Sequence, residues 1–324
     1  MKRLLVCSIL ALPFTGTLFA QQPDTPQAPV FRSGTNMVAL NVTVTDGKKH
    51  YVTGLTQGDF AVFEDGVQQQ VRFFEASEVP VDLIVLIDTS SSMRDKMDTV
   101  HEAAIGFLQT MRGSDRGAVV AFNDGVEVVQ GLTSDRAALE QAVRSTDAKG
   151  STSLHNALYI ALKQFGKSAQ AATDLRRQAI AVLSDGEDTS SLISFDDVLA
   201  IARKSGVSIY TIGLRSKYAS KDAGPATSRY FSTADFSMKS LAQETGAQSF
   251  FPAHVSDLKD VYAAIAEELA SQYSMAYTPA NARPDGRYRR IVVRVANRPD
   301  LRPRTRSGYT PEAERAISAL RPMR

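Results

Sequence analysis

Three short segments of the chain carry oxygen-bearing side chains that could act together in chemistry. In the first, Asp88, Ser90 and Ser92 place a carboxylate and two hydroxyls at every second position. The other two contain Thr152, in a Gly-Ser-Thr-Ser sequence, and Asp185, in a Ser-Asp-Gly sequence. Carboxylate and hydroxyl oxygens are hard donors, which suit Mg²⁺, Mn²⁺ or Ca²⁺ better than zinc or copper. These residue types therefore predict a divalent-cation site.

The elements that must position these side chains follow from the hydrophobic pattern. Largely continuous apolar runs, typical of parallel strands covered on both faces, occupy residues 83–87, 118–122, 179–183 and 207–212. Apolar stripes at helical spacing lie at residues 100–111, 154–165 and 258–269. This alternation over 81–272 predicts a doubly wound α/β domain with a mostly parallel sheet. Ligands of such sheets bind beyond the carboxyl ends of the strands, so the polar segments should meet at one edge.

Outside that region the hydrophobic pattern has a period of two, which indicates antiparallel strands. It occurs at residues 37–45, before the α/β region, and at 273–277 and 291–295 after it. Asp-Gly pairs at residues 46–47 and 65–66 predict hairpin turns. Since the ends of a domain often lie close together, we expect the two flanks to form one antiparallel β-sandwich into which the α/β domain is inserted.

The sequence thus divides into six predicted parts. They are a signal peptide (1–20), a linker (21–30), an N-terminal β unit (31–78), the α/β domain (81–272), C-terminal strands that pack with the N-terminal unit (273–310) and a tail (311–324). Within the α/β domain, the polar stretch 214–235 is predicted to be a long surface loop.

The first 20 residues have the pattern of a signal peptide. Lys2 and Arg3 precede an apolar run at 4–12, and residues 15–20 are typical of a cleavage region. We therefore expect a secreted, periplasmic or cell-envelope protein, with an uncleaved anchor as the alternative. The single cysteine, Cys7, lies in this leader, so the mature chain would depend on its core rather than on disulfides. No other stretch of the sequence suggests stable membrane insertion.

The three polar segments, in this order, resemble the von Willebrand factor type A domain. The D-x-S-x-S motif, the Gly-Ser-Thr loop and the Ser-Asp-Gly segment each lie beside the element that the family requires, and the similarity covers about residues 81–272. The flanks are similar to secreted bacterial proteins related to this family, through residues 52–55, 59–60, 64–66 and 306–309. Ser151 departs from the family, which often has a second glycine there. The resemblance implies a metal-ion-dependent adhesion site formed by Asp88, Ser90, Ser92, Thr152 and Asp185.

The resemblance implies binding rather than catalysis. A cation (Mg²⁺, or Mn²⁺ or Ca²⁺) held at this site would bind an acidic residue of a partner protein, in adhesion or protein assembly. In some members the affinity changes when the last helix, here near 258–272, shifts. We expect no enzyme, because no nucleophile or general base with an orienting partner accompanies the motif. Two alternatives stay open: a metal-assisted hydrolase and a scaffold whose metal is purely structural.

Charge and the remaining motifs exclude other classes of protein. The chain has 37 basic and 35 acidic residues, a balance that argues against a general nucleic-acid binder. It contains no P-loop, G-x-G-x-x-G, G-x-S-x-G or H-E-x-x-H sequence. Residues 281–324 hold 12 arginines and four acids, which we interpret as the outward face of strands rather than as a patch for an anionic partner. Near the site, we expect His155 at the surface, Asp188 as either a solvated surface carboxylate or a helix N-terminal charge, and the Asp88 loop exposed.

Overall fold

The structure is a computed structural model that describes residues 37–76, 79–171, 176–185, 187–214, 232–283 and 285–311. All of them belong to the second of two units into which the chain divides, residues 36–324. The predicted signal peptide and linker, most of the predicted loop at 214–235 and all but one residue of the predicted tail lie outside the described residues. Within the described part, no helix combines the length and the apolar character needed to cross a membrane.

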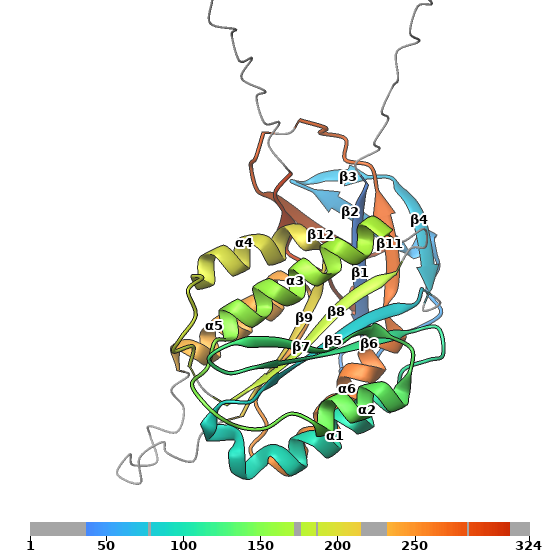
Figure 1. Cartoon of the computed structure of the whole chain (residues 1–324). Coiled ribbons are helices and arrows are strands. Elements are labelled where there is room, and N and C mark those ends of the chain that lie inside the picture. Colours follow the sequence, from blue (N-terminus) through green and yellow to red (C-terminus); the bar gives the residue numbers. More distant parts are fainter. Residues whose placement is uncertain are drawn as a thin grey trace, which may run out of the picture. The chain divides into compact units, whose positions relative to one another are not determined.

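A six-stranded sheet forms the centre of the α/β part (Figure 1). Its strands run in the order β10-β9-β8-β5-β6-β7, and neighbours are parallel except for β6 and β7. The strands are β5 (Val81–Asp88), β6 (Arg116–Phe122), β7 (Val126–Thr133), β8 (Arg177–Ser184), β9 (Ser208–Gly213) and β10 (Ser249–Phe250). Both faces of β5 are buried, with Leu83 and Val85 in one core and Ile84 and Leu86 in the other. The continuous apolar runs are therefore interior strands, as predicted.

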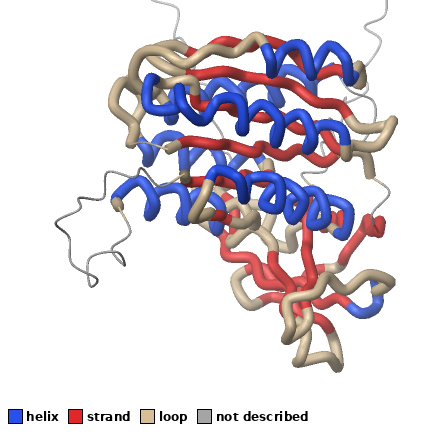
Figure 2. Tube along the Cα trace, turned by 90° about the horizontal axis from the view of Figure 1, so that it is seen from below, coloured by secondary structure: helices blue, strands red, loops and turns tan. Residues whose placement is uncertain are grey.

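Helices cover both faces of this sheet, as Figure 2 shows. The helices are α1 (Met97–Gln109), α2 (Arg136–Arg144), α3 (Leu154–Ala171), α4 (Phe195–Ser205), α5 (Thr233–Glu244) and α6 (Leu258–Ser271). Apolar residues of α1, α2 and α6 join the core on the Leu83 side, and those of α3, α4 and α5 join the core on the Ile84 side. This two-sided covering confirms the predicted doubly wound α/β fold.

The flanking strands form two antiparallel sheets of four strands each, in the orders β13-β1-β11-β4 and β14-β12-β2-β3. The strands before the α/β part are β1 (Val38–Thr45), β2 (Phe60–Glu64), β3 (Val67–Gln69) and β4 (Val71–Ala76). Those after it are β11 (Tyr273–Tyr277), β12 (Arg289–Val295), β13 (Arg302–Arg304) and β14 (Gly308–Tyr309). Both neighbours of β1 come from the C-terminal flank. The N-terminal strands β1, β2 and β4 therefore each pair with a strand from the far end of the chain.

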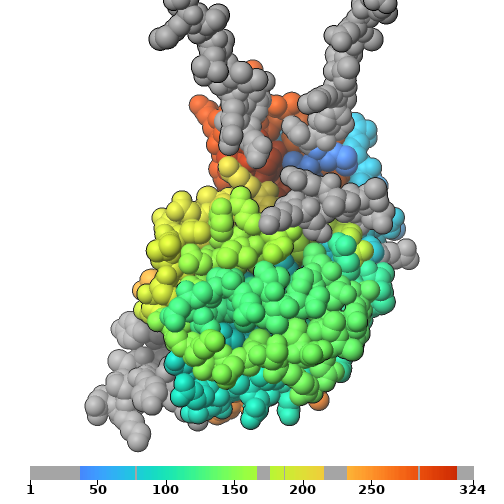
Figure 3. All heavy atoms as spheres, viewed as in Figure 1, coloured from blue at the N-terminus to red at the C-terminus, as the bar shows by residue number. Residues whose placement is uncertain are grey.

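One hydrophobic core joins the two flanking sheets. Leu40 of β1 and Met275 of β11 come from the first sheet, and Val62 of β2 and Val293 of β12 come from the second. Figure 3 shows the blue beginning and the orange-to-red end of the described chain packed together. The predicted β-sandwich built from both ends of the chain is thus confirmed.

The arginine-rich end of the chain faces outward only in part. Arg290 and Arg294 of β12 are exposed, as predicted. Arg289, in contrast, is only 2% exposed, and its Nη1 lies 3.3 Å from Oε1 of the buried Glu64. Because side chains alternate along a strand, Arg289 shares the inward face with Ile291. The expectation of a wholly outward row of arginines is therefore wrong at this position.

A buried carboxylate on α6 joins the α/β part to the sandwich. Glu268 is fully buried, and its oxygens accept hydrogen bonds from Tyr210 (2.9 Å), Gln248 (2.5 Å), Tyr51 (3.3 Å) and Thr43 (3.4 Å). Arg304 of β13 supplies the compensating charge, with Nη2 2.6 Å from Oε2. Tyr210 lies on β9, whereas Thr43 and Arg304 lie on sandwich strands. One carboxylate therefore satisfies donors from both parts.

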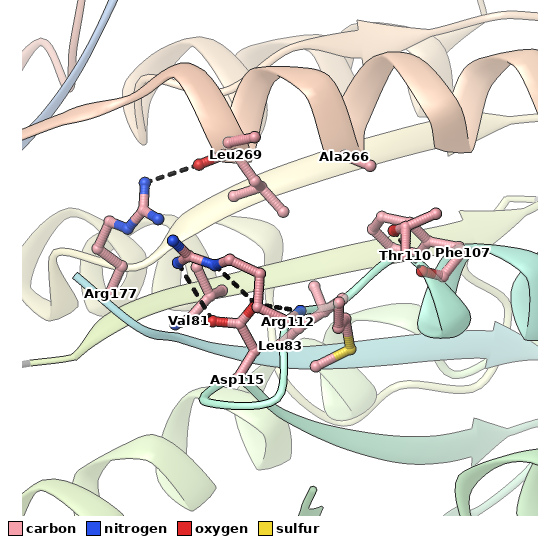
Figure 4. A pocket seen from close by; sticks show the side chains of 11 residues that line it. Val81, Leu83, Phe107, Thr110, Arg112, Asp115, Arg177, Ala266 and Leu269 are labelled. Carbon is pink, nitrogen blue, oxygen red and sulfur yellow. Dashed lines mark hydrogen bonds and ion pairs between the residues drawn. The ribbon is translucent and has the colours of Figure 1, made fainter. Parts of the chain in front are cut away.

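A second cluster fastens the two places where the chain passes between the parts (Figure 4). Arg177, the first residue of β8, donates from Nε to the Val79 carbonyl (3.0 Å) and from Nη1 to the Leu269 carbonyl (2.7 Å). Asp115 accepts a hydrogen bond from the Val81 amide, 2.8 Å away. Burial lowers the pKa of Arg177 to about 10. The cluster borders a cavity of about 70 Å³ and fixes the first residues of β5 and β8.

Replacing Glu268 by alanine should lower the free energy of unfolding by about 3–5 kcal/mol, because the buried Tyr210 hydroxyl and the partly buried Arg304 guanidinium would lose their common partner. The matched control is Glu267→Ala, since Glu267 is the exposed neighbour on the same helix. Its effect should stay within about 0.5 kcal/mol. Urea unfolding of both variants checks the prediction, and equal losses would show that Glu268 is not the residue that joins the two parts.

Candidate metal centre

The strand order places both predicted carboxylates at the same edge of the sheet. Asp88 is the last residue of β5, and Asp185 directly follows β8. These strands are parallel neighbours, with Ile87 paired to Leu183. Because the carboxyl ends of parallel strands share one edge, the two side chains lie beside each other at the centre of the sheet.

The serines of the D-x-S-x-S motif connect the two carboxylates. Asp88 Oδ1 accepts a hydrogen bond from the Ser90 amide (2.8 Å), and Ser90 Oγ lies 3.0 Å from Ser92 Oγ. Ser92 Oγ donates to Asp185 Oδ1, 2.7 Å away. The structure therefore brings four of the five predicted residues into one hydrogen-bonded chain.

Thr152 reaches this edge through the loop before α3. The Ser91 amide donates to the Gly150 carbonyl (3.0 Å), and the Lys149 amide donates to the Thr89 carbonyl (2.7 Å). These bonds hold the loop that carries Thr152 against the serine motif. Among the described residues, no hydrogen bond links the Thr152 hydroxyl to the other four predicted side chains. Thr152 is thus near them by backbone contacts alone.

Asp88 is the most deeply buried residue of the site. It is 0% exposed, and Ser184 Oγ donates to its Oδ2 at 2.5 Å. Burial raises the pKa of Asp88 and the charge of Asp185 adds to this effect, while hydrogen bonds from Ser184 and Ser90 oppose it. The expectation of an exposed loop is wrong for Asp88 and Ser90, which are buried, and holds for Ser92. Two carboxylates are therefore crowded together away from water, an arrangement that favours a bound cation.

Asp124 is a positioning residue that the sequence did not single out. Its Oδ1 accepts a hydrogen bond from the Ser151 amide (2.7 Å), and this bond lowers the pKa of the carboxyl. Gly150 has a φ of +73°, and a Cβ there would collide with the Asp124 carboxylate. Ser151 contributes its backbone to this contact, so the departure from a second glycine leaves the loop intact.

Asp188 organises the start of α3. Its Oδ2 accepts from the His155 amide (2.8 Å) and its Oδ1 from the Ser191 amide (3.0 Å). Of the two roles predicted for Asp188, the structure therefore shows the charge at a helix N-terminus rather than the solvated surface carboxylate. His155, also expected at the surface, has a side chain only 18% exposed, and its Nδ1 lies 3.2 Å from the Ile193 carbonyl oxygen.

Lys96 is the charged neighbour that the motif did not reveal. Its ammonium forms an ion pair with Asp185 Oδ2 and donates to the Ser92 carbonyl oxygen at 3.1 Å. Lys96 ends the 3₁₀ turn Ser91–Lys96, four residues after Ser92. This spacing corresponds to about one helical turn and is the only signal in the sequence for the contact.

The donor set suits a small, hard cation. Among the described residues, no three His, Cys, Asp or Glu side chains gather closely enough to hold a metal ion, so hydroxyls would have to complete the ligand set. In the octahedral geometry of Mg²⁺, with ligands about 2.0–2.1 Å from the ion, neighbouring oxygens are about 2.9 Å apart. Ser90 Oγ and Ser92 Oγ, at 3.0 Å, match this spacing, which also permits a hydrogen bond between them.

Comparison with known proteins identifies the fold that carries this site. The chain matches the family model of the von Willebrand factor type A domain over residues 82–264, more than half of its length. The resemblance drawn from the motifs is thereby confirmed. Among curated proteins, the chain matches an uncharacterized protein of Synechocystis sp., with 27% identity over 131 residues. That match covers 37% of this chain and 30% of the relative, so the chain spans less than a third of the relative's length.

The solved structures that resemble this chain include two from bacteria. One is the vWF domain of the type V pili tip protein Mfa5 from Porphyromonas gingivalis, at 17% identity and a TM-score of 0.46, covering 58% of this chain and 94% of that chain. Another is a von Willebrand factor type A structure from Catenulispora acidiphila, at 16% identity and a TM-score of 0.48, covering 87% of this chain and 65% of that chain.

With metal removed by a chelator, Asp88→Asn should be at least as stable as the wild type at neutral pH, because the wild-type residue carries a buried charge. A raised carboxyl pKa favours the neutral form in the folded state. The stability that this group contributes is therefore present below its unfolded pKa of about 3.9 and is lost as the pH rises through the folded pKa. Urea unfolding from about pH 4 to 8 should show this loss in the wild type but not in the variant.

The control for this experiment is Asp98→Asn, which alters an exposed carboxylate on α1. Its stability should follow the wild-type dependence on pH. If Asp88→Asn is clearly less stable than the wild type over the whole pH range, the buried charge of Asp88 does not destabilise the metal-free fold.

Proposed function

The chain belongs to the von Willebrand factor type A family, and we propose that it binds partner proteins through a divalent cation, in an adhesion or assembly role and without enzymatic activity. The proposed ligands are Asp88, Ser90, Ser92, Thr152 and Asp185, and the proposed cation is Mg²⁺, or Mn²⁺ or Ca²⁺. The observation that carries the proposal is the hydrogen-bonded chain from Asp88 through Ser90 and Ser92 to Asp185 at the centre of the sheet edge.

The charge of the ligand set supports binding of an acidic partner group. A bound divalent cation would supply an electrophilic centre for a carboxylate from the partner. Asp88 and Asp185 can balance its two charges, while the hydroxyls of the serines and of Thr152 remain neutral. Ser184 and the Ser90 amide hold the Asp88 carboxylate in place, so the site is arranged before a partner arrives. A negatively charged group of the partner can then bind a cation whose two charges the two carboxylates of the site already balance.

The surroundings of the site support a docking function rather than hydrolysis. A hydrolase needs a general base within reach of the attacking water, and His155, the histidine nearest in sequence to Thr152, is held by the Ile193 carbonyl and the Phe195 ring. We therefore favour binding over the hydrolase alternative. The scaffold alternative, with a structural metal, differs from binding only in whether partner capture needs the metal.

An exposed apolar side chain beside the site offers a contact to the partner. Leu192 is 95% exposed, although its amide is bonded to Asn156 Oδ1 (3.2 Å). The amides of Thr189 and Ser190, in the same loop, donate to the Thr152 carbonyl at 2.9 and 3.1 Å. The loop that bonds Thr152 therefore also carries an exposed leucine, which is an arrangement suited to a protein interface.

We place the protein outside the cytoplasm, either secreted or in the periplasm and cell envelope. The support for this location is the leader pattern at residues 1–20, which lies outside the described residues. The partner would then be another protein of the same compartment, and no nucleic acid is expected as a ligand.

The test of the proposed function is calorimetric titration of the full chain with MgCl₂, followed by capture of envelope proteins with Mg²⁺ or with chelator. The wild type should bind Mg²⁺ and retain partners only with Mg²⁺, and Asp88→Ala should do neither. Asp98→Ala, on the exposed side of α1, is the control that should do both. Unchanged Mg²⁺ affinity in Asp88→Ala would remove the assignment of the metal site. Metal-independent capture by the wild type would favour the scaffold.

Thr152→Ala should weaken partner binding by about 1–3 kcal/mol, the scale of one donor at a charged centre, and should weaken Mg²⁺ binding less. Thr152 also lies two residues before α3, at a position from which a threonine hydroxyl can cap a helix. In the structure, Asp188 and Ser191 bond the His155 and Asn156 amides, so the variant should unfold at nearly the wild-type temperature. Thr152→Ser keeps the hydroxyl and is the control. Equal losses of metal and partner affinity would instead indicate a static structural site.

A further inference from the structure

Lys96 lies outside the ligand motif and yet contacts one of its carboxylates. We propose that the Lys96 ammonium is an internal counter-ion that competes with the divalent cation for Asp185 and so sets the metal affinity of the site. This inference rests on the proposed function, because it presupposes that Asp185 is a metal ligand. The observation behind it is the ion pair between Lys96 Nζ and Asp185 Oδ2.

Both oxygens of Asp185 have protein partners in the structure. Oδ1 accepts a hydrogen bond from Ser92 Oγ (2.7 Å), and Oδ2 is paired with Lys96. The same ammonium donates to the Ser92 carbonyl oxygen at 3.1 Å. Lys96 therefore contacts two of the proposed ligand residues at once. A cation that takes electron density from Asp185 must weaken this ion pair.

The two partners of the ion pair differ in their freedom to move. The Asp185 side chain is only 1% exposed and directly follows β8, whose register with β5 is fixed along its length. The Lys96 side chain is 20% exposed and stands on a flexible four-carbon stem. Lys96 is therefore the partner that can turn toward solvent, while Asp185 stays at the site.

The charges at the site give the direction of the effect. Asp88 and Asp185 carry two negative charges, and Lys96 offsets one of them. A divalent cation would offset both, and it would repel the ammonium at the short distances of this site. Because Lys96 is tethered next to the carboxylate, it is present at a high effective concentration. Removing its charge should therefore strengthen metal binding and weaken the metal-free fold.

The experiment is calorimetric titration of the chelator-treated full chain with MgCl₂, on the wild type, Lys96→Met and Lys96→Gln. Arg94→Met is the matched control, because Arg94 is an exposed cation on the same 3₁₀ turn. We expect both Lys96 variants to bind Mg²⁺ about tenfold more tightly than the wild type, the effect of one modest ion pair. Arg94→Met should change the affinity by less than about twofold.

Thermal unfolding provides a second readout that does not depend on a partner. In chelator, Lys96→Met should unfold at a lower temperature than the wild type, and saturating Mg²⁺ should raise its unfolding temperature by more. Lys96→Arg keeps the charge and should resemble the wild type. If Lys96 did no more than hold the turn, replacing it would lower stability both in chelator and in Mg²⁺ and would not tighten Mg²⁺ binding.

The outcomes separate this inference from the function on which it rests. Tight Mg²⁺ binding by the wild type, with equal or weaker binding by both charge-removing variants, overturns the counter-ion role and leaves the metal site standing. Mg²⁺ binding by the two charge-removing variants but not by the wild type would give the strongest support to the counter-ion role. If neither the wild type nor any variant binds Mg²⁺, the metal site itself fails and the counter-ion role fails with it.

Discussion

The crowding of two carboxylates at the end of the central strands is the constraint on which the site depends. Asp88 is fully buried, and Asp185 lies directly after the end of the neighbouring strand. Burying a carboxylate is costly unless it is paired and hydrogen-bonded. The surrounding residues offset this cost. Ser184 and the Ser90 amide donate hydrogen bonds to Asp88, and Ser92 and Lys96 contact Asp185. A divalent cation would complete the same compensation.

The frame that holds these carboxylates is fastened at the opposite ends of their strands. β5 begins at Val81, whose amide is bonded to Asp115, and β8 begins at Arg177, which bonds the carbonyls on both chain crossings. Each strand has eight residues. The buried cluster that joins the α/β part to the sandwich therefore also fixes the strands that end at the site. Glu268 adds a second attachment through α6.

The fold and the gathering of the site were predictable, because they follow from patterns along the chain. The apolar runs at 83–87 and 179–183 predict strands covered on both faces, and parallel strands end at one edge. The contacts of Lys96 and Asp124 were not predictable, because a charged residue in a loop has the same sequence signature whether it is solvated or reaches across to another loop. For the same reason the sequence left two roles open for Asp188. Arg289 shows a related limit, since the alternation of its strand turns a cation inward to a buried carboxylate.

The most direct test of the metal site is anomalous diffraction from crystals of the full chain soaked in MnCl₂. We expect one strong manganese peak at the carboxyl edge of the sheet, with Ser90 and Ser92 Oγ within the bonding range of oxygen ligands, at most about 2.6 Å. We also expect the Lys96 ammonium to have moved away from Asp185. A peak at another place, or no peak while Lys96 remains on Asp185, would contradict the proposed metal site.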